Sequence, residues 1–288
     1  LITGSNGQLG SEIKELSPKY ENLDCIFKDI PELDICDANL LNSFVTNQNI
    51  KAVINCAAYT SVDKAEEDFE IAESVNVKGV SNLVNALEKV NGKLIHISTD
   101  YVFDGKSFLP YQVSDEVNPL GVYGKTKRRG ELVVLNSNID GIVIRTSWLY
   151  SLHGSNFVKT MLKLGKEEDE IKVIFDQVGT PTNANDLAKT CLDIICFGKQ
   201  NMINSNGKIY HYSNEGVASW YDFAIAIMAF GKLDCNIKPI ETRDYQTRAK
   251  RPHFSVLNKS KIKKDFKIEI PFWRDSLSQC ISKLNTNK

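Results

Sequence analysis

The chain has 288 residues, of which 42% are hydrophobic and 25% charged, and its formal net charge at pH 7 is -1. This composition is typical of a soluble globular protein, organised as one large domain or as two coupled ones. A nearly neutral chain gives no reason to expect nucleic acid or an anionic membrane as a partner. The sequence has no apolar run of the roughly 18 residues that a membrane-spanning helix needs. Because its scattered cysteines fit reduced thiols, we expect a cytoplasmic protein.

Cysteine and histidine spacing argues against a metal or disulfide framework. The seven cysteines include no Cys-x2-Cys pair, and the four histidines show no ligand spacing. An odd number of scattered cysteines predicts reduced thiols. His96, within the apolar segment "LIHIS", is expected to be a core residue. Because the sequence starts with Leu1 inside an apolar stretch, we also expect that a few residues precede it.

The first half of the chain alternates short apolar segments with longer amphipathic ones. The apolar segments predict buried parallel strands at Leu1–Thr3, Asp24–Lys28, Ala52–Cys56, Lys93–Ser98 and Ile142–Thr146. The amphipathic segments predict helices at Leu9–Leu16, Ala38–Thr46, Ala65–Val90 and Tyr123–Leu135. This alternation predicts an α/β fold with a Rossmann-like, doubly wound parallel sheet.

A glycine-rich loop connects the first predicted strand to the first predicted helix. In "LITGSNGQLGSEI", Gly4, Gly7 and Gly10 permit a tight turn and let backbone N–H groups approach a phosphate. The N-terminus of the following helix adds partial positive charge. Because the loop has both the strand and the helix that such a motif requires, it predicts a dinucleotide-binding site.

The fourth predicted strand ends in a polar turn, in the segment "LIHISTDYVFDG". Ligands of doubly wound sheets bind outside the carboxyl ends of the strands, so Thr99 is expected beside the cofactor. Tyr123 and Lys127 follow in "GVYGKTKRRG", four residues apart and therefore on one face of a helix. The other cations of this segment, Lys125, Arg128 and Arg129, are interpreted as a solvated face.

Thr99, Tyr123 and Lys127 together suit the reduction of a carbonyl group. Hydride transfer to carbon leaves negative charge on oxygen, which needs a proton donor within hydrogen-bond reach. A phenol with a pKa near 10 holds its proton at neutral pH. An ammonium group one helical turn away would lower that pKa, and a threonine hydroxyl can donate a hydrogen bond to the oxyanion.

After residue 150 the alternation becomes looser. Ser219 and Asp222 predict a capping box that starts a helix to about Phe230, and helical patterns also lie near Asn185–Cys196 and Asp275–Leu284. We expect an NAD(P)-binding Rossmann domain over residues 1–150. The remainder, 151–288, is expected to be mainly a substrate-binding lobe, with some segments (about 183–212) returning to the Rossmann domain.

Nine sequence blocks resemble the dTDP-4-dehydrorhamnose reductase family, in the extended branch of the short-chain dehydrogenase/reductase superfamily. They are "TGSNGQLG", "ELDICD", "NCAAYTSVDKAEED", "STDYVFDG", "YGKTKRRGE", "IRTSWLY", "NFVKTML", "GTPTNANDLA" and "RPHFSVL". The likeness extends from residue 1 to about 285. It implies reduction, by NAD(P)H, of the 4-keto group of a dTDP-bound 6-deoxy sugar, the last step in making dTDP-L-rhamnose.

The resemblance also implies which residues bind the two ligands. Thr99, Tyr123 and Lys127 match the family's catalytic trio, and Leu33 would flank the adenine with Asp34 and Ile35. The implied cofactor-binding residues are Gly4, Asn6, Gly7, Gln8, Leu9, Gly10, Asp29, Asp34, Ile35, Ala57, Ala58, Tyr59, Tyr123 and Lys127. The implied substrate-binding residues are Thr99, Asp100, Tyr101, Trp148 and Arg251.

Beyond the catalytic trio, Asp29, Trp148 and Arg251 each have an expected chemical role. Asp29, 19 residues after Gly10, would bond the adenosine ribose of NADH, whereas Lys28 would pair with the extra phosphate of NADPH, so the choice of cofactor stays open. Trp148 would present an apolar ring to the deoxysugar, and Arg251 would neutralise the diphosphate.

Several alternatives stay open. Some relatives bind magnesium through acidic residues at a dimer interface, but Glu12 and Glu15 are interpreted as solvated carboxylates, so magnesium is possible and no metal site is assigned. The substrate could instead be another nucleotide sugar, for a reductase or epimerase, since the base pocket comes from the variable second lobe. A non-catalytic role, like that of the regulatory subunit of methionine adenosyltransferase, would be favoured by loss of Tyr123 or Lys127, and both are present. A monomer or a homodimer is expected.

Overall fold

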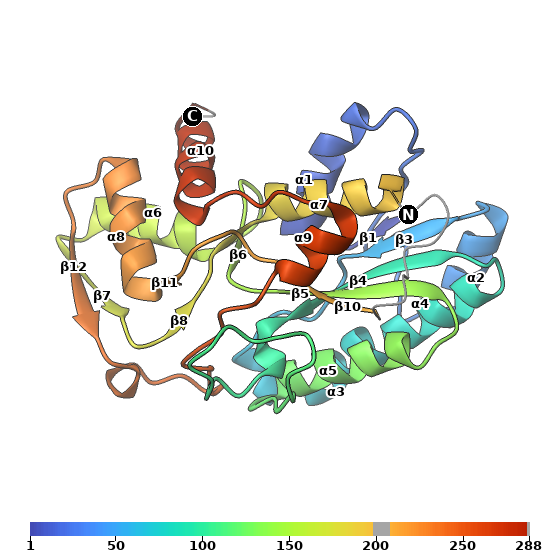
Figure 1. The fold of residues 1–288 in the computed structure, drawn as a ribbon, viewed down its shortest axis with the longest axis horizontal. Helices are drawn as coiled ribbons and strands as arrows, with labels where there is room; N and C mark the ends of the chain where they lie inside the picture. The colour runs from blue at the N-terminus through green and yellow to red at the C-terminus, as the bar shows by residue number, and fades with distance from the viewer. Residues whose placement is uncertain (198–207, 287–288) are drawn as a thin grey trace.

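The computed structural model describes residues 1–197 and 208–286. Its centre is a six-stranded parallel sheet with the strand order β10-β5-β4-β3-β1-β2 (Figure 1). The strands are β1 (Ile2–Thr3), β2 (Phe27–Lys28), β3 (Ala52–Asn55), β4 (Lys93–Thr99), β5 (Asp140–Thr146) and β10 (Ile209–His211). The chain winds from β1 outward to β2 and then returns to β3 on the other side of β1. The predicted fold class is confirmed.

Helices cover both faces of this sheet (Figure 1). One face carries α1 (Gln8–Leu16), α7 (Ala184–Phe197) and α9 (Ser260–Phe266). The other face carries α2 (Ala38–Asn47), α4 (Gly79–Glu88) and α5 (Val122–Leu135). Neighbouring strand residues supply the two cores, because successive side chains point to opposite faces. Ile54 and Ile95 belong to the first core, and Val53 and Leu94 to the second.

The second lobe is built from two-stranded sheets and three helices around its own hydrophobic cluster. The helices are α6 (Phe157–Glu167), α8 (Trp220–Gly231) and α10 (Trp273–Thr286). Its strand pairs are β7 (Glu170–Ile174) with β12 (Asn236–Ile240), β8 (Val178–Gly179) with β11 (Ala218–Ser219), and β6 (Leu149–Tyr150) with β9 (Thr182–Asn183). The predicted capping box is confirmed, since Ser219 and Asp222 each accept a backbone N–H from the other at the start of α8.

The predicted helix over Ala65–Val90 is wrong as a single element. The chain there forms a 3-10 turn at Lys64–Glu66, a short helix α3 (Phe69–Glu73), a π-helical turn at Ser74–Lys78, and then α4. Asn76 lies in the π-helical turn, where its buried amide bonds the Tyr59 backbone and the Thr126 hydroxyl. Such turns often occur near functional sites. Further 3-10 turns are Ser17–Lys19, Asp100–Val102 and Thr242–Asp244.

Part of the second half of the chain packs with the sheet. α7 packs against α1, and β10 pairs with β5 at the sheet edge. Of the segment 183–212 that was expected to return there, residues 198–207 lie outside the described part of the chain. The division into domains at residue 150 stays a prediction.

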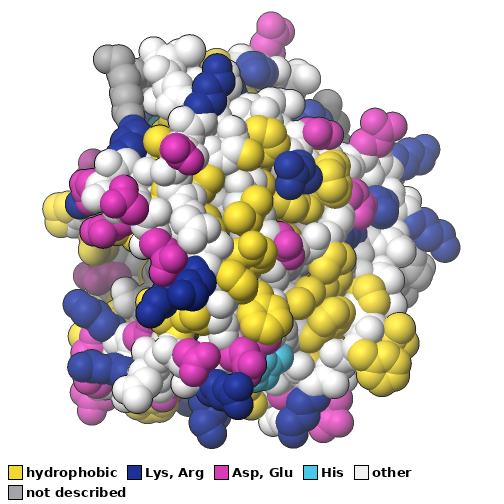
Figure 2. Space-filling view, turned by 90° about the vertical axis from the view of Figure 1, so that its left-hand side faces the viewer, with side chains coloured by type: hydrophobic (Ala, Val, Ile, Leu, Met, Phe, Trp, Pro, Cys, Tyr) yellow, Lys and Arg dark blue, Asp and Glu magenta, His cyan; other side chains and the backbone are white. Residues whose placement is uncertain are grey.

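The end of the second lobe carries charges of both signs, interspersed with hydrophobic side chains (Figure 2). Exposed hydrophobic residues in this half of the chain include Phe175, Ile225 and Phe272. No basic stripe of the kind that binds nucleic acid is visible on this face (Figure 2). Within residues 1–197 and 208–286, no helix combines the length and apolar composition needed to cross a bilayer.

Candidate active site

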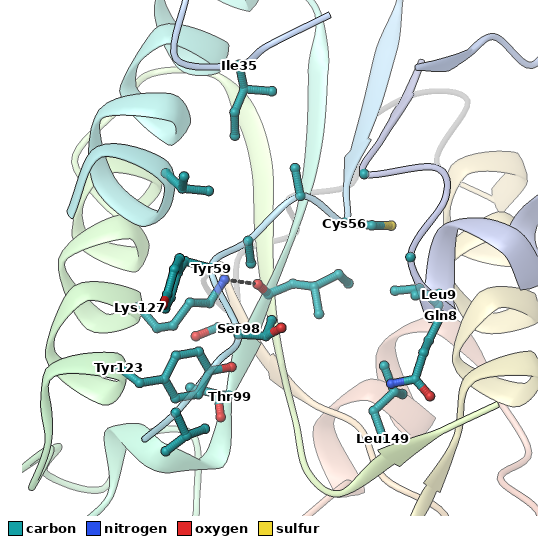
Figure 3. Close-up of a pocket in the computed structure, with 18 of the residues that line it drawn as sticks. Gln8, Leu9, Ile35, Cys56, Tyr59, Ser98, Thr99, Tyr123, Lys127 and Leu149 are labelled. Carbon is teal, nitrogen blue, oxygen red and sulfur yellow. Dashed lines mark hydrogen bonds between the residues drawn. The ribbon is translucent and has the colours of Figure 1, made fainter. Parts of the chain in front are cut away.

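A cavity of about 1150 Å³ opens at the carboxyl ends of β1, β3, β4 and β5. This is where the strand order reverses, which is the usual ligand position in open α/β sheets. Figure 3 shows Tyr123 and Lys127 on the α5 side of the cavity, and Gln8 and Leu9 on the α1 side. The cavity therefore joins the glycine loop to the predicted catalytic residues.

The glycine loop needs its glycines for steric reasons. Gly4 has φ +63°, and a Cβ there would lie 2.6 Å from the backbone nitrogen of Ala57. A Cβ on Gly10 would lie 2.5 Å from the Gly4 carbonyl oxygen. Gly7 precedes α1, so the helix N-terminus with its free N–H groups lies at the loop, suited to a phosphate.

Acidic and apolar residues line the part of the cavity beside β2. Asp29, Leu33, Asp34 and Ile35 all line it. Asp29 is oriented by the backbone N–H of Asn6, which donates to its carboxylate at 2.8 Å. Lys28, the alternative partner for a 2′-phosphate, is paired with Glu32 at 2.6 Å.

The segment after β3 forms the floor of the cavity, with Ala57, Ala58 and Tyr59. The backbone N–H of Tyr59 donates to Asn76 in the π-helical turn, and the Tyr59 hydroxyl donates to Asp68 at 2.7 Å. The π-helical turn that the sequence did not predict thus holds a cavity-lining segment.

Thr99, Tyr123 and Lys127 all line the same cavity. The buried Lys127 donates from Nζ to the carbonyl oxygen of Ile97 at 2.7 Å, which fixes α5 to the end of β4 (Figure 3). Thr99 Oγ1 donates to Asp100 at 3.0 Å. The Tyr123 ring packs edge-on against Tyr101, with ring centroids 5.5 Å apart.

Burial dominates the ionisation of these groups. It lowers the pKa of Lys127 to about 8, although the negative charge of Glu131 acts in the opposite direction. It raises the pKa of Tyr123 to about 12, against the effect of the nearby Thr99 hydroxyl. The predicted lowering of the phenol pKa by Lys127 is therefore wrong for this structure, in which loss of hydration is the largest influence on Tyr123. Burial also raises the pKa of Asp100 to about 6.

A buried ionic network behind the site was missed by the sequence analysis. Glu131 is one helical turn beyond Lys127, and its carboxylate accepts hydrogen bonds at 2.8 Å from both Nε and Nη2 of Arg145 on β5. Ser98 Oγ donates to the same carboxylate at 2.7 Å, and Arg128 donates at 2.8 Å. The interpretation of Arg128 as merely solvated is wrong, whereas Lys125 is exposed as expected. This network fixes α5 to the strands that end at the cavity.

The expected substrate residues are only partly brought together. Asp100, Tyr101 and Trp148 line the cavity, but Arg251 does not. Arg251 is held by Asp63, with Nη2 donating at 2.6 Å and Nη1 at 3.2 Å. In this arrangement its charge is already neutralised by a carboxylate, so the expected role at the diphosphate stays a prediction.

The interpretation of Glu12 as a solvated carboxylate is wrong. Glu12 is buried and accepts hydrogen bonds from Ser151 Oγ at 2.7 Å and Asn185 Nδ2 at 2.8 Å, which join α1 to the second half of the chain. Glu12, Glu15 and His153 lie close enough to share a metal ion. However, Glu15 is paired with His153, and magnesium prefers an octahedron of oxygen ligands. No metal is assigned.

The fold, the glycine loop at the strand reversal and the Thr-Tyr-Lys set in one cavity define a dinucleotide-binding protein of the extended short-chain dehydrogenase/reductase class. The chain also matches the family described as "RmlD substrate binding domain" over residues 1–286. It belongs to that family.

Named relatives cover nearly the whole chain. A dTDP-4-dehydrorhamnose reductase of Aggregatibacter actinomycetemcomitans is 40% identical over 285 residues, which is 96% of both chains. The solved structure of a dTDP-4-dehydrorhamnose reductase from Clostridium acetobutylicum has a TM-score of 0.92 and 41% identity, covering 99% of this chain and 98% of that one. The reductase of Bacillus anthracis, solved in complex with NADP, has a TM-score of 0.91 and 35% identity, covering 98% of each chain.

Proposed function

We propose that this protein is a dTDP-4-dehydrorhamnose reductase. It reduces the C4 keto group of dTDP-4-dehydro-6-deoxy-L-mannose with NAD(P)H and forms dTDP-L-rhamnose. The observation that carries the proposal is that Gly4, Thr99, Tyr123 and Lys127 line the same cavity. The relatives' names supply the substrate.

The residues of the cavity suit this reaction. A bound nicotinamide cofactor supplies the hydride. Tyr123, whose raised pKa keeps its proton in place at neutral pH, donates that proton to the C4 oxygen. The Thr99 hydroxyl donates a hydrogen bond to the same oxygen as negative charge develops. The Lys127 ammonium group stabilises the tyrosinate that is left.

The cofactor, location and assembly state complete the proposal. The glycines let the loop pack closely on itself and on the segment after β3, and the N-terminus of α1 at the cavity suits the phosphates of a dinucleotide. The NADP complex of the Bacillus anthracis relative supports NADPH, and the carboxylate of Asp29 at the cavity suits NADH, so both remain proposed. We propose a cytoplasmic enzyme that is a monomer or a homodimer.

A substrate panel tests the function. Purified protein is mixed with NADPH or NADH and with the 4-dehydro-6-deoxy sugar carried on dTDP, UDP or GDP, and cofactor absorbance is followed. We expect oxidation with the dTDP sugar at the highest kcat/KM. A preference for UDP or GDP would reassign the substrate. No oxidation with any sugar, together with intact NADPH binding, would favour a binding partner without catalysis.

Activity is expected to decline above about pH 8. The pKa of Lys127 is lowered to about 8 by burial, so its ammonium group loses a proton as the pH rises through that value. The loss removes the positive charge that stabilises the tyrosinate. The measurement is the pH profile of kcat/KM for the cofactor, which reports ionisations of the free enzyme. A profile that stays flat to pH 10 would contradict the role given to Lys127.

Lys127 and Lys125 are expected to differ sharply. Lys127→Met removes the buried charge at the cavity and should lower kcat/KM about 100-fold. Lys125→Met, a matched change of an exposed side chain on the same helix, should stay within about twofold of the parent. Steady-state kinetics at saturating NADPH measures both. Equal effects would refute the assignment of one lysine to the chemistry.

A further inference from the structure

Trp148 has an unusual backbone conformation at the wall of the cavity. Its φ is +47°, in the left-handed region that bulky side chains rarely adopt. Such strain persists only where the surroundings enforce it. Two hydrogen bonds hold the chain at this point. Ser147 Oγ donates to the Thr180 carbonyl at 2.8 Å, and the Thr182 N–H donates to the Trp148 carbonyl at 3.1 Å.

A second tryptophan braces the ring of Trp148. Trp220 stacks on it with ring centroids 3.7 Å apart and an interplanar angle of 9°. Trp220 is the first residue of α8, and the capping box of Ser219 and Asp222 fixes where that helix begins. Phe157 packs on Trp220 with centroids 4.7 Å apart, so the brace continues into the core of the second lobe.

Gly179, in the strand pair β8–β11, lies against the same ring. A Cβ on Gly179 would lie 2.7 Å from Ser255 Oγ, 2.8 Å from Cε2 of Trp148 and 2.9 Å from Cζ2 of Trp148, so only glycine lets the indole and the Ser255 side chain lie where they do. Gly179 pairs with Ala218, two residues before Trp220. Because Trp220 directly follows β11, this antiparallel pair places both the glycine and the stacking tryptophan beside Trp148.

One ring of the stack lines the cavity, next to β6. Leu149, the neighbour of Trp148, lies across the cavity from Tyr123 and Lys127 (Figure 3). Trp148 lines the cavity, whereas Trp220 does not. Trp220 thus acts on a bound ligand only through the ring that it supports.

We propose that Trp220 and Gly179 are positioning residues, which hold the indole of Trp148 against the sugar of the nucleotide-sugar substrate. This inference rests on the proposed function and deepens it. An aromatic face gains contact with the C–H groups of a deoxysugar, so the stack selects for the sugar and leaves the dinucleotide unaffected. The second lobe thereby contributes a specificity element to a cavity whose cofactor side is built on the sheet.

The test compares four variants with the parent protein. Trp220→Leu removes the stack, Trp220→Phe keeps a smaller ring, and Gly179→Ala adds a Cβ against the Trp148 indole. Trp273→Phe is the control, because Trp273 belongs to the same hydrophobic cluster and does not take part in the stack. Near-UV circular dichroism reports the coupling of the two stacked indoles. Steady-state kinetics give kcat and the KM for the sugar, and fluorescence titration gives the Kd of NADPH.

We expect Trp220→Leu to lose the coupled indole signal and to raise KM for the dTDP sugar about tenfold, with the Kd of NADPH unchanged. Trp220→Phe should recover part of that loss, Gly179→Ala should raise KM in the same direction, and Trp273→Phe should keep both the signal and KM. An unchanged KM in Trp220→Leu would overturn the inference, as would parallel losses of NADPH affinity and of melting temperature. Absence of turnover in the parent protein would instead overturn the proposed function, and the two failures are therefore distinguishable.

Discussion

Tyr123→Phe is expected to reduce turnover by about 10²- to 10⁴-fold, the usual contribution of a positioned proton donor. The substitution removes only the hydroxyl group. The ring that packs edge-on against Tyr101 remains, so the cavity should keep its shape. Burial holds the pKa of Tyr123 at about 12, which means that the parent phenol carries its proton throughout the pH range of an ordinary assay.

The control for this variant is cofactor affinity. Titration of NADPH, followed by quenching of protein fluorescence, should give nearly the same Kd for Tyr123→Phe and the parent. Turnover close to the parent value would refute the assignment of Tyr123 as the acid. A large loss of NADPH affinity would show that the hydroxyl serves binding instead.

Arg145→Met is expected to lower the free energy of unfolding by about 3–5 kcal/mol, because it leaves the buried carboxylate of Glu131 without its main partner. Both side chains are almost fully excluded from water, with 1% exposure for Arg145 and 0% for Glu131. Urea denaturation followed by circular dichroism measures the change. Arg129→Met is the matched control, since the Arg129 side chain is 54% exposed in its pair with Glu73 and should contribute less than about 1 kcal/mol.

A double variant separates the value of the ion pair from the cost of breaking it. Glu131→Leu combined with Arg145→Met removes both charges, and buried pairs replaced in this way are often nearly neutral for stability. We expect the double variant to be more stable than Arg145→Met alone. A double variant that is less stable than either single variant would contradict the view that an unpaired buried charge is what destabilises Arg145→Met.

Features that depend on neighbouring residues were predictable from the sequence. The glycine loop joins a strand directly to a helix, and Thr99 ends a buried strand, so their position at the sheet edge follows from the parallel fold. The spacing of Tyr123 and Lys127 required only a helix. The capping box at Ser219 is equally local. For such elements, local pattern and tertiary structure agree.

Features that depend on distant partners were not predictable. The burial of Glu12 arises because Ser151 and Asn185, far along the chain, supply its hydrogen-bond donors. Arg251 is paired with Asp63, which is 188 residues away in the chain. An isolated charged residue in a sequence is usually solvated, and only the folded chain reveals which ones acquire partners.

Ionisation and backbone conformation also depend on distant residues, so the sequence did not predict them correctly here. The helical spacing of Tyr123 and Lys127 indicated a lowered phenol pKa, but the degree of burial, which the spacing does not contain, raises it. Likewise, the amphipathic pattern over residues 65–90 gave no sign of the π-helical turn around Asn76, which is stabilised by contacts to Tyr59 and Thr126.

The fate of the hydride tests the proposed reaction most directly. The protein is incubated with dTDP-4-dehydro-L-rhamnose and with NADPH that carries deuterium at the transferable position of the nicotinamide, and the product is analysed by NMR and mass spectrometry. We predict dTDP-L-rhamnose with deuterium at C4 of the sugar, in an amount equal to the NADPH consumed. Failure to consume NADPH and also NADH with the same label, or a product without deuterium at C4, would contradict the proposal that this cavity reduces the 4-keto group of a dTDP sugar.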